Sequence, residues 1–193
     1  PFILVIGFFA FTARDQAILE TQYDDPDVCI TAIGKQWAFD FQYAGNDCED
    51  ASDAVWSMGV QAQTDDQGNI TSELPTLYLP VDKEVKIKLT SRDVIHSFWI
   101  IDFLYKKDMY IGKDNYWSFT PTRVGEYDGK CAELCGQYHS MMLFDVKVVE
   151  QAEYDAYLAS LRDAGQTGDI NDAYDRLQNL PGTDGHAESE GDH

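Results

Sequence analysis

The chain has 193 residues, with 14 basic against 34 acidic side chains and a formal net charge of −20. This length suits one domain with its own core, and a content of 44% hydrophobic residues excludes a chain that is disordered throughout. The acidic excess argues against nucleic acid as a partner, because little could neutralise a run of phosphates. Acidic side chains are concentrated in residues 14–75 and 150–193. They fit either a solvated or salt-adapted surface or a docking face for a cationic protein.

The chain begins with an apolar run. Residues 2–11 (FILVIGFFAF) are almost entirely hydrophobic, and polar residues follow at 12–15. A membrane span needs about 20 residues, so the run is about half of one. We interpret residues 1–14 as the outer end of a truncated transmembrane helix, in preference to a buried strand or a signal-peptide remnant.

Residues 15–149 carry short runs with the alternation that is typical of β-strands. Residues 28–43 predict one long strand, or two, bent near Gly34. Further strands are predicted at 55–62, 77–81, 85–89, 94–101, 116–119, 125–131 and 142–149. Strands this short and closely spaced predict an all-β sandwich or small barrel.

The pattern changes after residue 149. Residues 150–164 place Tyr154, Leu158 and Leu161 at helical spacing, and 169–180 predicts another turn or two. We therefore expect a helical C-terminal extension over 150–180. The remainder, 181–193, is rich in glycine and acidic residues and is predicted to be a disordered tail.

The residues with metal chemistry gather in 131–142 (CAELCGQYHSMM), with one more histidine upstream in DVIHSFW. The candidate ligands are His96, Cys131, Cys135, His139 and Met142. Thiolate and thioether ligands beside imidazole select copper, and a weak axial methionine marks electron-transfer copper. Structural zinc gains nothing from a methionine, and a disulfide between the two motif cysteines is a second alternative. The combined set favours copper.

The motif C-x-E-x-C-G-x-x-H-x-x-M, preceded by D-V-x-H-S-F, resembles subunit II of the haem–copper cytochrome c oxidases, from the apolar start to about Val149. The resemblance implies a cupredoxin-like Greek-key β-barrel or sandwich that carries a binuclear copper A centre. It implies that Cys131 and Cys135 bridge both coppers and that His96 and His139 each bind one. Met142 and the backbone carbonyl of Glu133 would complete the two sites.

The resemblance also implies roles outside the ligand set. Residues 34–37 match G-x-Q-W, which makes Trp37 the candidate port for the incoming electron, against the alternative of a core tryptophan. The Glu133 carboxylate would reach a magnesium site shared with the catalytic subunit, and Asp93 would lie among acids near the cytochrome contact. The wording HSFWIIDF and the acidic insert at 44–73 resemble actinobacterial oxidases, whose donor is typically a membrane-attached multihaem cytochrome.

By this resemblance the chain is an electron-transfer subunit that is enzymatic only within an oxidoreductase complex. It would accept electrons from a c-type cytochrome and pass them to haem in subunit I, where oxygen is reduced. It would sit in a bacterial cell membrane beside subunit I and the other subunits, with its copper domain on the extracytoplasmic, periplasmic side.

Several alternatives remain open. The copper domain of nitrous oxide reductase resembles the same centre, but that family normally has tryptophan at the position of Glu133. Quinol oxidase subunits share the fold and lack the copper ligands. The remaining hypotheses are a soluble copper carrier and a structural module held together by zinc or a disulfide. Cys29 and Cys48 lie outside the motif, and either a disulfide or two free thiols fits them.

Overall fold

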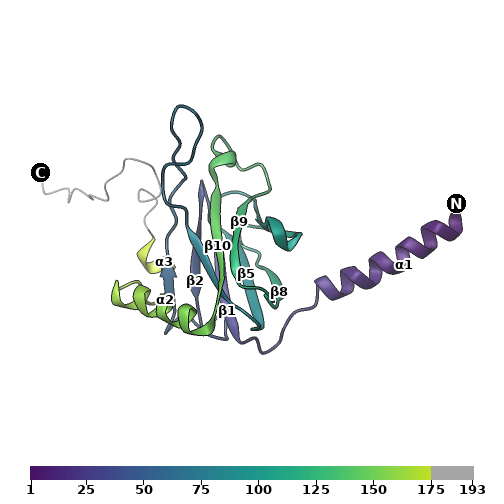
Figure 1. Cartoon of the computed structure of the whole chain (residues 1–193), viewed down its shortest axis with the longest axis horizontal. Helices are drawn as coiled ribbons and strands as arrows, with labels where there is room; N and C mark the ends of the chain where they lie inside the picture. The colour runs from purple at the N-terminus through teal and green to yellow at the C-terminus, as the bar shows by residue number, and fades with distance from the viewer. Residues whose placement is uncertain (175–193) are drawn as a thin grey trace, which may run out of the picture.

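The computed structural model describes residues 1–174 and arranges the strands in two five-stranded sheets (Figure 1). The expected all-β architecture is confirmed. The predicted tail at 181–193, and the end of the helical prediction at 169–180, lie outside the described residues. The division of the chain at residues 14, 149 and 180 stays a prediction.

The first sheet has the strand order β3-β2-β1-β5-β8. Its strands are β1 (Val28–Lys35), β2 (Ala38–Tyr43), β3 (Val55–Ser57), β5 (Val85–Ser91) and β8 (Asn115–Phe119). Strand β1 pairs in parallel with β5, and the other pairs are antiparallel. Of the two alternatives for residues 28–43, the structure has two strands, and they form a hairpin that turns at residues 36–37, just after Gly34.

The second sheet has the order β4-β10-β9-β6-β7. Its strands are β4 (Thr76–Pro80), β6 (His96–Ile100), β7 (Tyr105–Met109), β9 (Gly125–Cys131) and β10 (Leu143–Val149), joined in part by the short 3-10 helices η1 (Ile101–Phe103) and η2 (His139–Met141). Strand β7 (YKKDM) was not predicted. Its burial alternates weakly, because it lies at the sheet edge, and this leaves little periodicity to recognise.

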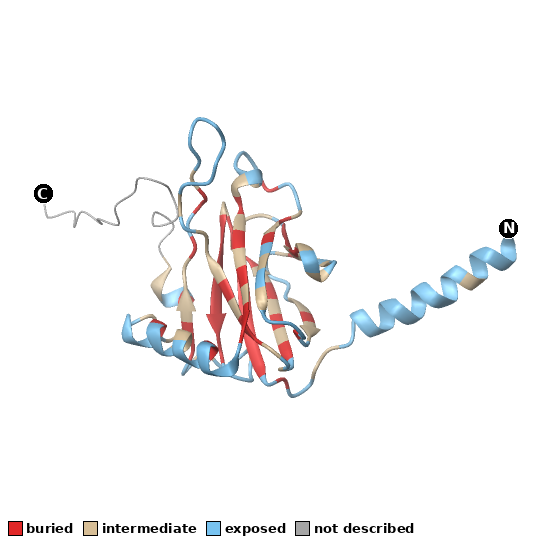
Figure 2. Cartoon of the chain, viewed as in Figure 1, coloured by how far each residue is buried: buried red, intermediate tan, exposed pale blue. Residues whose placement is uncertain are grey.

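Three α-helices complete the described chain: α1 (Phe2–Leu19), α2 (Gln151–Asp163) and α3 (Ile170–Ala173). Helix α1 continues five residues past the expected limit at residue 14, because 15–19 still contains good helix formers. It is long and apolar enough to cross a membrane, and Figure 2 shows it exposed along its length. Helix α2 confirms the helix predicted from periodicity and buries Tyr154 and Leu161.

Buried residues lie along the central strands of the sandwich (Figure 2), and aromatic rings from both sheets contact one another in the core. The ring centroid of Phe144 on β10 lies 4.8 Å from that of Phe39 on β2 and 4.8 Å from that of Phe98 on β6. Strands of both sheets therefore share one close-packed core, which fixes the sheets relative to each other.

Cys29 on β1 and Cys48 in the acidic loop 44–54 form a disulfide, with their Cα atoms 5.2 Å apart. This separation lies within the usual range for bridged cysteines. The disulfide alternative is therefore the one that the structure adopts, and the acidic loop is tied to the first sheet.

The core can be tested with two leucines of opposite exposure. Leu89 is 0% exposed, so Leu89→Ala is expected to lower the free energy of unfolding by about 2–5 kcal/mol. Leu104 is 90% exposed, and Leu104→Ala should change this free energy by less than about 0.5 kcal/mol. Denaturant unfolding of the purified chain measures both, and equal losses would contradict the assigned core.

Candidate metal centre

The predicted ligands meet at one end of the second sheet. His96 begins β6, Cys131 ends the neighbouring strand β9, and the loop 132–142 between β9 and β10 carries the others. Two backbone hydrogen bonds fix the loop: Cys131 N–H donates to Met142 O at 2.9 Å, and Ala132 N–H donates to Ser97 O at 2.9 Å. The sheet thus brings residues that are far apart in sequence to one point.

The two cysteine sulfurs are the centre of the cluster and lie 3.8 Å apart. On one side, Cys131 Sγ is 3.8 Å from His96 Nδ1 and 3.2 Å from the carbonyl oxygen of Glu133. On the other, Cys135 Sγ is 3.5 Å from His139 Nδ1 and 3.8 Å from Met142 Sδ. Each sulfur therefore has one imidazole and one weaker donor beside it.

Asp93 orients His96 from behind. The Asp93 Oδ1 carboxylate oxygen lies 2.9 Å from His96 Nε2, which directs Nδ1 toward the sulfurs. A carboxylate on the outer nitrogen fixes the tautomer of a metal-binding histidine in this way. Burial by itself lowers the pKa of His96, but the bond to Asp93 and the neighbouring Cys131 outweigh it, and the pKa is raised. The sequence predicted Asp93 only as one of the acids near the cytochrome contact, and did not predict its hydrogen bond to His96.

The two thiols do not titrate alike. The hydrogen bond with Cys135 lowers the pKa of Cys131 well below its usual value, and His96 acts in the same direction. The same hydrogen bond raises the pKa of Cys135. One thiolate is thus favoured at neutral pH, and thiolate is the form that binds metal.

The β1–β2 hairpin of the first sheet closes over the cysteine loop. Gln36 Nε2 donates to Cys135 O at 2.9 Å, and Trp37 Nε1 donates to the same oxygen at 3.1 Å. Gly136 has a φ of +118°, which favours glycine, and a Cβ there would meet the Trp37 ring at 3.2 Å. Trp37 is half-buried, packs against the edge of the core and contacts the metal loop directly, so its role as the electron port stays a prediction.

Sequence reasoning missed two residues of this arrangement. The sequence predicted Gln36 only as a member of the G-x-Q-W match. In the structure its side chain donates a hydrogen bond to the Cys135 carbonyl oxygen, as Trp37 does. Gly34 leaves space for His96, because a Cβ on Gly34 would lie 2.8 Å from His96 Cδ2. Both residues belong to the G-x-Q-W match, but their contacts with Cys135 and His96 arise only from the packing of the two sheets.

The donor set fits copper. The structure gathers His96, Cys131 and Cys135 with ligand atoms within 4.8 Å of one another, and His139 and Met142 lie against Cys135. Sulfur with imidazole is the environment that copper prefers. The Glu133 side chain is exposed, and residues 1–174 supply no cluster of oxygen ligands around it.

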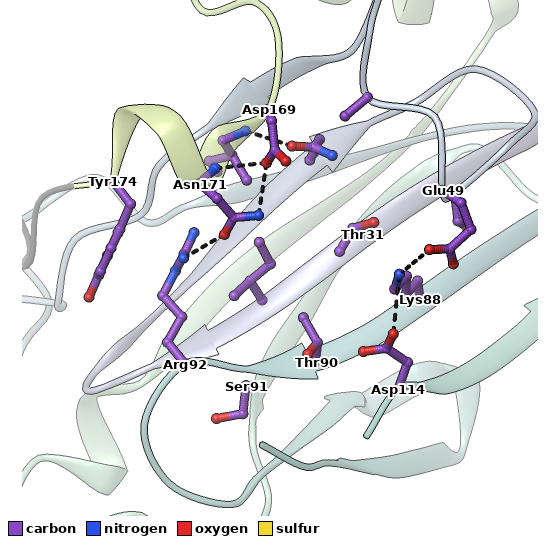
Figure 3. A pocket seen from close by; sticks show the side chains of 15 residues that line it. Thr31, Glu49, Lys88, Thr90, Ser91, Arg92, Asp114, Asp169, Asn171 and Tyr174 are labelled. Atoms are coloured by element: carbon purple, nitrogen blue, oxygen red, sulfur yellow. Dashed lines mark hydrogen bonds and ion pairs between the residues drawn. The ribbon is translucent and has the colours of Figure 1, made fainter. Parts of the chain in front are cut away.

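A separate cavity of about 530 Å³ lies over β1, β2 and β5, beside α3 (Figure 3). Its charged groups are paired: Lys88 Nζ lies 2.7 Å from Glu49 Oε2, and Arg92 Nη1 donates to Asn171 Oδ1 at 2.8 Å. No predicted metal ligand lines it. The cavity therefore does not compete with the cysteine cluster as the metal centre.

Residues 28–149 match the family described as cytochrome c oxidase subunit II, periplasmic domain. A probable cytochrome c oxidase subunit 2 of Streptomyces avermitilis is 41% identical over 191 residues, which cover 87% of this chain and 59% of that protein. This chain therefore spans about three-fifths of the length of the relative.

Solved structures give the same result for the fold. The periplasmic domain of cytochrome oxidase subunit II from Bradyrhizobium japonicum has a TM-score of 0.59 and 27% identity, covering 74% of this chain and 99% of that domain. A mixed disulfide between a thioredoxin-like protein and subunit II of cytochrome c oxidase has a TM-score of 0.57 and 29% identity, covering 76% and 98%. The fold is thus cupredoxin-like as expected. With the apolar helix α1, it is consistent with a membrane-anchored protein that has an extracytoplasmic domain.

The unequal thiols give a test on the metal-free chain. Cys135→Ala removes the thiol that is hydrogen-bonded to Cys131, so the pKa of Cys131 should rise, while His96 continues to lower it. Ultraviolet thiolate absorbance, recorded against pH without oxygen, measures the change. Met142→Leu is the matched control, because a thioether carries no proton to donate, and it should leave the titration in place. An unchanged curve for Cys135→Ala would refute the assigned hydrogen bond.

Proposed function

Since the chain belongs to the cytochrome c oxidase subunit II family, we propose that it receives single electrons for such an oxidase at a binuclear copper centre. It takes them from a c-type cytochrome and delivers them to haem in the catalytic subunit, where oxygen is reduced. The observation that carries this proposal is the pairing of two cysteine sulfurs, each with its own imidazole and its own weaker donor.

Each residue has a distinct task. Cys131 and Cys135 would hold the copper ions through their sulfurs, and His96 and His139 would each supply Nδ1. Met142 Sδ and the carbonyl oxygen of Glu133 would be the weaker ligands. A binuclear copper centre held by these residues would supply one-electron transfer. The buried His96 and Met142, both 0% exposed, keep water from the inner side of the centre.

Trp37 is the proposed point where the electron enters the chain. Its indole is half-buried and lies 4.9 Å, centroid to centroid, from the exposed ring of Tyr138. The indole also donates to the backbone of Cys135. It therefore spans the distance between the protein surface and a copper ligand.

The remaining partners follow from the family and from the exposed groups. Helix α1 anchors the chain in a bacterial membrane, with the copper domain on the periplasmic side and against subunit I. The exposed Glu133 carboxylate supplies one ligand to a magnesium ion, whose other ligands come from that subunit. The donor is a c-type cytochrome attached to the same membrane. The family match and Glu133 between the cysteines favour this function over the copper domain of nitrous oxide reductase.

Copper content with electron paramagnetic resonance tests the proposal. The purified chain loaded with copper should bind two ions per chain and give the hyperfine pattern of one electron shared by two copper nuclei, with a band at the far-red edge of the absorption spectrum. One copper with the pattern of a single nucleus would indicate a mononuclear cupredoxin. Zinc in place of copper, or a Cys131–Cys135 disulfide that prevents copper binding, would show that the site has only a structural role.

A second prediction concerns Trp37. Trp37→Phe should slow oxidation of the cytochrome by the intact oxidase and leave the copper spectrum unchanged, because the ring is not a ligand. Trp56→Phe is the matched control: its indole also donates to a backbone carbonyl, that of Thr167, at 3.3 Å, but away from the cluster. Stopped-flow kinetics measure both variants. Equal rates for the two would remove Trp37 from the electron path.

A further inference from the structure

A cavity of about 520 Å³ lies where helix α1 meets the β-domain. The last residues of the helix, Ile18 and Leu19, form one wall, and η1, β8 and residues 120–123 form the others. Figure 1 places the end of α1 on the side of the domain away from α2. The cavity therefore lies at the end of α1 that adjoins the domain, and the proposed function takes α1 as a membrane span.

The end of α1 is fastened to the domain beside this cavity. Glu20 Oε1 accepts a hydrogen bond from Tyr105 Oη at 2.6 Å, and Glu20 Oε2 lies 2.5 Å from Lys107 Nζ. Tyr23 N–H donates to Ser118 Oγ at 3.1 Å. These contacts join the helix end to β7 and β8, so the walls of the cavity hold their positions relative to each other.

Aromatic side chains form the floor. The ring centroids of Trp117 and Phe119 are 4.2 Å apart, and Phe103 lies 5.5 Å from Phe119 and 5.3 Å from Tyr127. Tyr23 Oη, at the rim, is within 3.2 Å of Thr120 Oγ1. The hydroxyls of Tyr23 and Tyr127 give this otherwise apolar lining two polar groups, and tyrosine is enriched at the boundary between lipid and water.

Two exposed apolar residues follow lining residues of the cavity in the sequence. Leu104 follows Phe103, is 90% exposed and has a φ of +57°, a conformation uncommon for leucine. Val124 follows Arg123 and is 50% exposed. Exposed apolar side chains are common on protein surfaces, so these two do not by themselves indicate a ligand.

The rim carries one charge of each sign. The exposed Arg123 guanidinium donates from Nε to Tyr127 Oη at 3.4 Å, and the exposed carboxylate of Asp102 lines the same cavity. Arginine binds phosphate through charge-assisted hydrogen bonds, and a carboxylate attracts an ammonium group. A ligand that carries both a phosphate and an ammonium group matches the rim.

We propose that this cavity binds the headgroup of phosphatidylethanolamine. The phosphate binds Arg123, the ammonium group lies near Asp102, and the acyl chains run along Ile18 and Leu19 into the bilayer. The inference rests on the proposed function, because it takes α1 as a membrane span. A lipid bound there would brace the copper domain against the membrane surface.

Lipid titration of the intact oxidase tests the site. The complex is stripped of lipid in mild detergent, titrated with nanodiscs of phosphatidylethanolamine or phosphatidylglycerol, and analysed by native mass spectrometry. Arg123→Gln should weaken binding of one phosphatidylethanolamine about tenfold, the effect of losing one charge-assisted hydrogen bond. Asp102→Asn should abolish the preference for phosphatidylethanolamine over phosphatidylglycerol.

Arg162→Gln, the same change on the exposed face of α2, is the matched control and should bind lipid as the unaltered chain does. Unchanged lipid binding by Arg123→Gln would overturn the proposal. So would a photocrosslinker on Thr122→Cys that captures another subunit instead of lipid. Copper content and cytochrome oxidation, measured on the same samples, separate the two hypotheses: intact copper chemistry without a lipid effect refutes only the lipid site.

Discussion

The carbonyl oxygen of Cys135 joins the two halves of the molecule at the metal centre. It accepts hydrogen bonds from Gln36 and Trp37, which belong to the first sheet, while Cys135 itself lies in a loop of the second. The geometry of this contact depends on the aromatic core, because Phe39, Phe98 and Phe144 set the spacing of the sheets. The position of the Cys135 sulfur is thus a consequence of packing throughout the sandwich.

Buried charge beneath the same hairpin adds a second constraint. Lys35 Nζ lies 2.5 Å from Asp40 Oδ1, and both side chains are fully buried. Arg92 Nε is 3.6 Å from Asp40 Oδ2. Arg92 directly precedes Asp93, the residue that orients His96. Separating buried, paired charges is costly, so strands β1 and β2 resist sliding past each other. The pairing register places Trp37 at the turn and keeps it over the cysteine loop.

The sequence was sufficient for the strands with clear alternation and for finding the motif that holds the candidate ligands, since local spacing encodes both. Strand β5 (VKIKLTS) and residues 131–142 are examples. Features that depend on tertiary contacts could not be predicted. Strand β7 follows a sheet edge and lacks a strong period, and the hydrophilic Lys35 and Asp40 give no sign of burial. The Cys29–Cys48 disulfide depends on where the acidic loop returns, which spacing does not specify.

Contacts within the protein hold the donor atoms around the two cysteine sulfurs in place without a metal. Neighbouring pairs are 3.2–3.8 Å apart, and backbone hydrogen bonds to Ser97 and Met142 hold the ends of the loop. The entropy of ordering these side chains is therefore lost once, during folding, instead of at each change of oxidation state. An electron-transfer site benefits from such rigidity, because any ligand movement on reduction would add to the barrier. For the proposed electron transfer, the sandwich would contribute by holding the donor atoms in one geometry.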